Sequence, residues 1–328
     1  MKTPFLTSLM SFVVAVTATT LLLPGAMAQS TFPSSTVTLI VPYGAGGSAD
    51  VVARSLADKL SKAWSVPVLV DNRTGANGIV ATQALMRAPA DGHTILLHLT
   101  GVIQNVSLYK KRPYDPFSDI VPVTQLGTQS MGLAVSPKST YKDVQSLVKW
   151  LSSDPPNAAY GSFGAGSTGH IFGELLRSSV KSTMPHVAYR GEAPLIPEIM
   201  GGRVDFGFVS AATATERGKD GTLRILAMTG PKRQPSLPAV PTMGEVGVKG
   251  FDIVGWYGLF VPKGTPVATV ERIAEDTRMA LAKPEMAYRF KQLAIEPTGT
   301  NPRQFEIIMH EDFHRWDALI KRFNITLE

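Results

Sequence analysis

Short apolar runs alternate along the first third of the chain with segments whose apolar residues recur every three or four positions. The runs that predict buried strands cover residues 37–42, 66–70 and 94–99. Between the first two, Val52, Leu56 and Leu60 share one face of a helix that begins near Ser48. Because strands alternate with helices, the sequence predicts an α/β fold with a parallel sheet.

A second set of alternating elements follows two short strands at 121–126 and 132–135. Its predicted strands lie near 158–160, 185–188, 204–208 and 223–227, and its helices begin near Asp143, Ser167, Glu192 and Ala211. A strand at 251–261 then returns the chain to the first set. We therefore expect two lobes, the first formed by 29–128 and 256–328, the second by 129–255, with the return crossing within 228–260.

The chain closes with three predicted helices that carry proline in their first turn, where proline is well suited. They begin near Pro266, Pro284 and Pro302. In the last helix one stripe of apolar residues recurs at helical spacing: Phe305, Ile308, Met309, Phe313, Trp316, Ile320 and Phe323. This stripe is typical of core packing.

The amino terminus has the pattern of an export signal. Lys2 precedes an apolar run at 9–23, and Ala26-Met27-Ala28 predicts cleavage before Gln29, so that 1–28 form a cleaved signal peptide. A membrane anchor is the alternative, but the run is shorter than the about 20 residues that span a bilayer. The sequence has no cysteine, which excludes disulfides and a lipid-linked cysteine.

The composition is that of an ordinary globular protein, with 44% hydrophobic and 18% charged residues. The net charge of +6 falls to +5 when Lys2 leaves with the signal. The basic residues are scattered and do not alternate with aromatic residues, so nucleic-acid binding is not expected. A modest positive charge suits the attraction of small anions.

Two glycine-rich turns, at 41–50 and 160–170, each lead from a predicted strand into a helix. A helix start points free N–H groups outward and carries partial positive charge, so both turns are candidate anion cradles. Each also fits a dinucleotide motif, through Gly44, Gly46 and Ala49 in the first turn, with Asp71 beyond it, and through Gly164, Gly166 and Gly169 in the second. Export as an unfolded chain separates the protein from the nicotinamide cofactors of the cytoplasm, so we expect no bound cofactor.

Two catalytic patterns remain as alternatives. Ser167 stands in an elbow-like turn, and Asp205 with His310 or His314 would complete the chain order of a secreted serine hydrolase. The segment 310–314 matches the zinc-peptidase pattern HExxH, but both histidines fall on the polar side of the last helix and no third ligand follows. We expect neither a metal site nor an enzyme.

Three further residues have competing functional and structural explanations. Tyr189 ends a strand and either contacts a ligand or packs under Arg190. Asp205 either faces a cleft or caps a turn. His170 is expected to be packed or hydrogen-bonded rather than to touch a ligand.

Four segments carry a family resemblance. They read PYGAGGSAD at 42–50, DNRTGANG at 71–78, GAGSTGH at 164–170 and WYGLFVPKGTP at 256–266. In this order they resemble the Bug-type periplasmic solute-binding proteins of tripartite tricarboxylate transporters, over nearly the whole mature chain. The sequence departs from the family at Ala239, where an aspartate is usual, far from the expected site.

The resemblance implies a type II (Venus-flytrap) periplasmic binding protein, with two α/β lobes and a ligand cleft between them. It implies a monomer that captures a small carboxylate with backbone amides and hydroxyls, closes, and delivers it to the membrane permease of a tripartite tricarboxylate transporter. Asp50 is expected to brace its turn, and Thr100 to add to the rim of the first cradle. The expected ligand-binding residues are Tyr43, Ala45, Gly46, Gly47, Ser48, Asp50, Asn77, Thr100, Ser162, Ala165, Gly166, Ser167, Thr168, Tyr189 and Asp205. Which carboxylate is bound, and whether the receptor serves a permease or a sensor, stays open.

Overall fold

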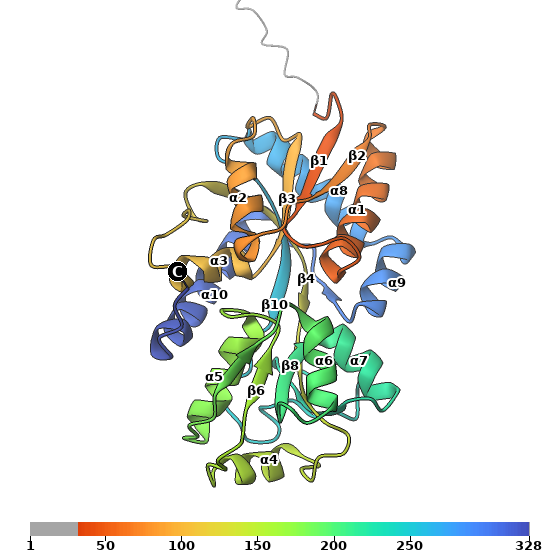
Figure 1. Ribbon diagram of the computed structural model, residues 1–328. Helices are drawn as coiled ribbons and strands as arrows, with labels where there is room; N and C mark the ends of the chain where they lie inside the picture. The colour runs from red at the N-terminus through yellow and green to blue at the C-terminus, as the bar shows by residue number, and fades with distance from the viewer. Residues whose placement is uncertain (1–31, 328) are drawn as a thin grey trace, which may run out of the picture. The chain divides into compact units, whose positions relative to one another are not determined.

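The computed structural model describes residues 32–327, and the predicted signal peptide lies outside them. These residues form an α/β protein with two sheets. Figure 1 shows α1 (Ser48–Trp64), α2 (Ile79–Met86) and α8 (Val267–Leu281) around the first sheet and the helices between 144 and 219 around the second. None of the helices within 32–327 combines the length and the apolar character that crossing a membrane requires.

The first sheet has the strand order β11-β4-β10-β3-β1-β2. Its strands are β1 (Val37–Val41), β2 (Val68–Asn72), β3 (Thr94–Leu99), β4 (Ile120–Gln129), β10 (Gly255–Pro262) and β11 (Glu296–Pro297). The pairs β1–β2 and β1–β3 are parallel, as the alternating pattern predicts, whereas β10 is antiparallel to both β3 and β4. The returning strand is thereby inserted into the middle of the sheet.

The second sheet has the order β7-β6-β8-β5-β9. Its strands are β5 (Met131–Val135), β6 (Tyr160–Ser162), β7 (His186–Ala188), β8 (Phe206–Ser210) and β9 (Arg224–Met228). Only Ser130 separates β4 of the first sheet from β5 of the second. The protein is thus two-lobed, but residues 32–327 group by contacts into one compact unit, so the lobe boundaries stay a prediction.

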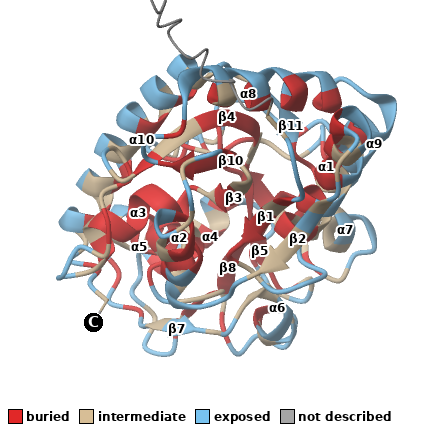
Figure 2. Ribbon diagram, turned by 90° about the horizontal axis from the view of Figure 1, so that it is seen from above, coloured by how far each residue is buried: buried red, intermediate tan, exposed pale blue. Residues whose placement is uncertain are grey.

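Each sheet is covered by helices on both faces because successive strand residues point to opposite sides. Leu39 and Val41 pack with α1, α8 and α9 (Pro284–Gln292), whereas Ile40 packs with α2, α3 (Gly101–Leu108) and α10 (Pro302–Arg322). In the second sheet α4 (Val144–Leu151) and α5 (Thr168–Ser179) cover one face, and α6 (Glu192–Met200) and α7 (Ala211–Lys219) the other. Figure 2 shows mostly buried strands and helices whose outer turns are exposed.

Two elements differ from the prediction. Residues 251–254 are not in a strand: Phe251 and Ile253 are buried in the core, but no strand pairs with them. Residues 101–108, for which the sequence predicted neither a helix nor a strand, form helix α3. Almost every residue of α3 is buried, so the helix shows no polar stripe from which a helical period could be read.

Candidate functional site

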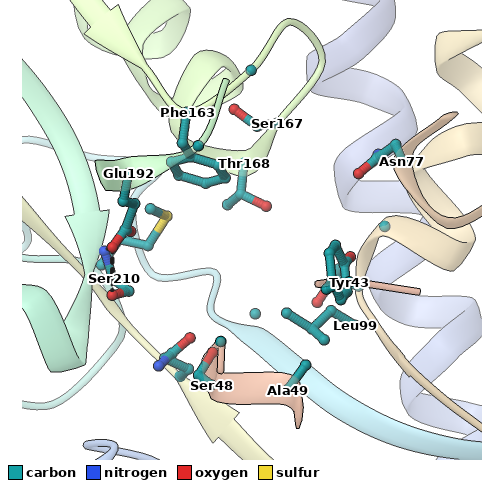
Figure 3. A pocket seen from close by; sticks show the side chains of 18 of the residues that line it. Tyr43, Ser48, Ala49, Asn77, Leu99, Phe163, Ser167, Thr168, Glu192 and Ser210 are labelled. Carbon is teal, nitrogen blue, oxygen red and sulfur yellow. Dashed lines mark hydrogen bonds between the residues drawn. The ribbon is translucent and has the colours of Figure 1, made fainter. Parts of the chain in front are cut away.

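A cavity of about 610 Å³ lies where the carboxyl ends of strands meet the starts of helices. Its lining comes from both sheets, with Ser48 and Thr100 from the first and Thr168 and Ser210 from the second. This volume lies in the range of small-molecule sites, and open α/β sheets bind ligands at this edge. Figure 3 shows the lining side chains converging on an open centre.

The first glycine-rich turn places the start of α1 at the cavity. Gly47 is the N-cap residue and no side chain caps this helix, so the N–H groups of its first turn are left for a ligand. Ser48 Oγ lies 3.0 Å from the Tyr257 hydroxyl, which donates to Gln129 Oε1 at 3.2 Å. Burial raises the pKa of Tyr257 to about 12, with a smaller contribution from the Glu192 carboxylate. Tyr257 therefore stays protonated and neutral beside Ser48.

Asp50 holds this turn from behind and does not line the cavity. Its carboxylate accepts from Gly46 N at 2.9 Å, from Arg54 Nε at 2.9 Å and from Asn72 Nδ2 at 2.9 Å. Burial alone raises the pKa of Asp50, but these hydrogen bonds and the Arg54 charge outweigh it and lower the pKa below its usual value. The ionised Asp50 braces the loop, as the sequence led us to expect.

The second glycine-rich turn brings the start of α5 to the cavity. Ser167 Oγ caps the helix by accepting from His170 N at 3.3 Å. Gly166 N donates to His170 Nδ1 at 3.0 Å, and Gly164 N to Ser162 Oγ at 3.2 Å. A histidine stack supports both bonds, because the ring of His186 lies 3.7 Å from that of His170 and its Nε2 is 2.7 Å from Ser162 Oγ.

Three further helices begin at the cavity. Thr100 precedes α3, and its hydroxyl accepts from Trp256 N at 2.8 Å. Gly191 precedes α6, and Ser210 is the N-cap residue of α7. With α1 and α5, five helix starts face one cavity, and each contributes partial positive charge. Gln104 Nε2 of α3 donates to Thr168 Oγ1 of α5 at 3.3 Å, which joins the two sides of the cavity.

The cavity collects eight of the residues expected from the sequence. They are Tyr43, Gly47, Ser48, Asn77, Thr100, Ala165, Ser167 and Thr168. Ala45 and Gly46 are exposed beside the lining, and Ser162 lies behind it, bonded to His186 and Gly164. Gly166, with a φ of +72°, faces Leu108 and Leu327 instead of the cavity.

Tyr189 and Asp205 lie outside the cavity lining. The Tyr189 hydroxyl donates to Glu198 at 3.4 Å, and its ring packs against the core of the second sheet. Asp205 accepts from Tyr141 Oη at 2.9 Å and from Ala159 N at 2.9 Å, which fastens the start of β8. These contacts agree with the packing explanation for Tyr189 and with the turn-capping explanation for Asp205.

Several lining residues were not expected from the sequence: Leu99, Gln104, Gln129, Met131, Phe163 and Glu192. Each begins, ends or follows a strand, or stands in the first turns of a helix. The signal that points to them is position at a strand end, combined with the strand order, which the sequence does not give.

The catalytic patterns do not form sites in residues 32–327. His310 stacks on Phe117 with 4.2 Å between ring centroids, and no group of three metal-ligating side chains lies together among the described residues. Ser167 Oγ caps α5, and Asp205 is held by Tyr141 and Ala159.

Comparisons with known proteins agree with this geometry. The model of the tripartite tricarboxylate transporter family receptor matches residues 52–325. The solved periplasmic binding protein BugD is 29% identical, with a TM-score of 0.80 over 90% of this chain and 100% of its own. A structure from R. palustris with adipate is 29% identical, with a TM-score of 0.82 over 90% and 100% of the two chains. MatC from Rhodopseudomonas palustris with bound malate is 28% identical, with a TM-score of 0.79 over 88% and 100%. The chain therefore belongs to the tripartite tricarboxylate transporter receptor family, as a solute-binding receptor of the Bug type and not an enzyme.

Proposed function

We propose that this chain is a periplasmic receptor that captures a small carboxylate in the cavity and presents it to the membrane subunits of a tripartite tricarboxylate transporter. The observation that carries the proposal is the convergence of five helix starts on one cavity, in a family in which related structures hold adipate and malate. The export pattern at 1–28 is consistent with a periplasmic location.

The cavity suits a carboxylate because its donors are already in place. A carboxylate only accepts hydrogen bonds, and bonds to a charged acceptor are the stronger kind. The free N–H groups at the start of α1 and the hydroxyls of Ser48 and Thr168 supply donors from both sides of the cavity. Backbone N–H groups are fixed before binding and lose little conformational freedom when the ligand arrives.

Capture proceeds by closure of the two lobes. A ligand bound at the start of α1 gains contacts with Thr168 and Ser167 only when the second lobe is near. The ligand then binds the closed form more tightly and raises its population. The closed form, which differs in surface from the open one, is the form that a permease recognises.

A thermal-denaturation screen of the purified mature protein against small carboxylic acids tests the proposal. A specific acid at 100 times its dissociation constant stabilises the fold by about 2.7 kcal/mol. The methyl ester of the same acid, which lacks the charge, is the matched control and should give no shift. Small-angle scattering should also record a smaller radius of gyration with the acid. Equal shifts with acids and esters, or no shift with any acid, contradict carboxylate capture.

A further inference from the structure

The cavity contains a fixed negative charge that a carboxylate receptor does not require. Glu192 lies in the lining, whereas Lys, Arg and His are absent from the lining residues within 32–327. In Figure 3 Glu192 and Ser210 lie across the open centre from Tyr43 and Leu99. One end of the cavity is therefore chemically different from the rest.

The Glu192 carboxylate is held in place by three hydrogen bonds. Its two carboxylate oxygens accept from Ser210 N, from Ser210 Oγ at 2.9 Å and from Thr213 Oγ1 at 2.6 Å. Glu192 is the first residue of α6, and Ser210 is the N-cap residue of α7. Negative charge is stabilised at the starts of helices, so the Glu192 carboxylate occupies the place that an anion would take there.

The five helix starts thus divide into two groups. Those of α6 and α7 are neutralised by Glu192, whereas α1 and α3 have no side-chain cap and α5 has only the neutral Ser167. A single ligand carboxylate has donors available at α1, α3 and α5. A second carboxylate directed toward α6 and α7 meets the like charge of Glu192 at short range, and the described lining residues include no basic side chain to offset it.

We infer that the ligand of this receptor is an amino carboxylate, with its carboxylate at the α1 and α5 cradles and an ammonium group directed to Glu192. This inference rests on the proposed carboxylate capture and adds to it the class of ligand. An ammonium group has three donors, and Glu192 is the charged acceptor in the cavity. Specificity arises because Glu192 attracts the amino acid and repels the dicarboxylate of equal length.

Matched series of ligands test the inference by isothermal titration calorimetry. One series is 4-aminobutanoate, succinate and butanoate, and the other is 6-aminohexanoate, adipate and hexanoate; glycine and alanine cover shorter spans. We expect the affinity for the amino carboxylate to be at least about tenfold higher than that for the dicarboxylate of the same length. The reason is that opposite charges attract and like charges repel at short range. Tighter binding of a dicarboxylate or an alkanoate overturns the inference and leaves carboxylate capture standing. Failure of every carboxylate to bind overturns the proposed function itself.

The variant Glu192→Gln separates charge from shape. Glutamine retains an oxygen that accepts from Ser210 N and an amide that bonds the hydroxyls, so circular dichroism and thermal denaturation should report an intact fold. The preference for the amino carboxylate should disappear, and the dicarboxylate should gain affinity. Glu198→Gln is the control on the same helix: Glu198 pairs with Arg203 at 2.5 Å outside the cavity lining, so its loss should leave the preference unchanged. A preference that persists in Glu192→Gln overturns the inference.

Discussion

At the scale of single residues, Ser167 has two functions that can be measured separately. Its hydroxyl caps α5 and also lines the cavity. Ser167→Ala should lower the free energy of unfolding by about 1 kcal/mol, the usual cost of an N-cap. It should also weaken the binding of the best carboxylate by about three- to tenfold, the equivalent of one hydrogen bond. Urea denaturation and calorimetry give the two quantities.

Asp143→Ala is the matched control for Ser167→Ala. Asp143 caps α4 by accepting from Ser146 N at 2.7 Å, and it does not line the cavity. It should therefore lower stability by a similar amount without a change in affinity. If Ser167→Ala lowers stability but not affinity, the hydroxyl of Ser167 does not contact the ligand.

At the scale of elements, the turn before α1 depends on a carboxylate that never touches the ligand. Asp50 is 3% exposed and accepts hydrogen bonds from the turn, from α1 and from β2. Asp50→Ala leaves Gly46 N without its acceptor and removes one of the two acceptors of Asn72 Nδ2, which should cost about 2 to 3 kcal/mol of stability. Because the turn then loses its fixed shape, affinity for the carboxylate should fall as well.

Asp58→Ala provides the comparison within the same helix. Asp58 pairs with Lys62 at 2.9 Å on the exposed face of α1, where an ion pair contributes little. Its loss should change stability by less than about 0.5 kcal/mol and leave affinity unaltered. Equal effects of the two variants on affinity would show that Asp50 acts on α1 generally and not on the turn.

The elements that the sequence predicted well are those with a clear pattern. The strands β1 and β3 are short apolar runs, and α1 shows a helical period, so both kinds of element follow from local spacing. Helix α3 was missed because burial on nearly all sides removes the period. Chain topology accounts for the other omissions: Met131 and Glu192 reach the cavity only because β5 pairs with β8, and the order of strands in a sheet is not written in local sequence.

The family resemblance located the two glycine-rich turns at the cavity, but it did not point to Glu192. Both glycine-rich turns are continuous motifs, and eight of the expected residues lie at the cavity. Glu192, in contrast, is held at the cavity by Ser210 and Thr213, which are distant in sequence and adjacent only after folding. A residue whose role depends on such partners is recognised from the structure.

At the scale of the whole molecule, buried histidines make the free energy of unfolding depend on pH. Burial lowers the pKa of His98 to about 4, and burial together with the neighbouring His170 lowers the pKa of His186 to about 4. In the unfolded chain both histidines titrate near their ordinary pKa of 6.5. The unfolded state therefore binds more protons below pH 6.5, so stability is full above that pH and is lost as the pH falls toward 4.

Asp312 changes the dependence of stability on pH in the opposite direction. Burial raises its pKa to about 6, against a smaller lowering by the hydrogen bond from Trp256 Nε1. Its contribution is complete below its unfolded pKa of 3.8 and is lost as the pH rises through 6. It therefore offsets part of the histidine effect, and the pH profile of the wild type alone does not isolate one group.

His186→Asn isolates the histidine contribution, because asparagine cannot titrate in this range and its amide can still bond Ser162. Between pH 7 and 4.5 the variant should lose about 1 to 2 kcal/mol less stability than the wild type, a value reduced from the full shift because the ring is partly exposed. Urea denaturation at both pH values measures the difference.

The stack of His186 on His170 also supports the hydrogen bonds of Gly164 N and Gly166 N at the second glycine-rich turn. Protonation of His186 should therefore loosen that turn at a higher pH than the one at which the protein unfolds. Carboxylate affinity in the wild type should accordingly fall over the same pH range, and identical pH profiles for the two proteins would place the titrating group elsewhere.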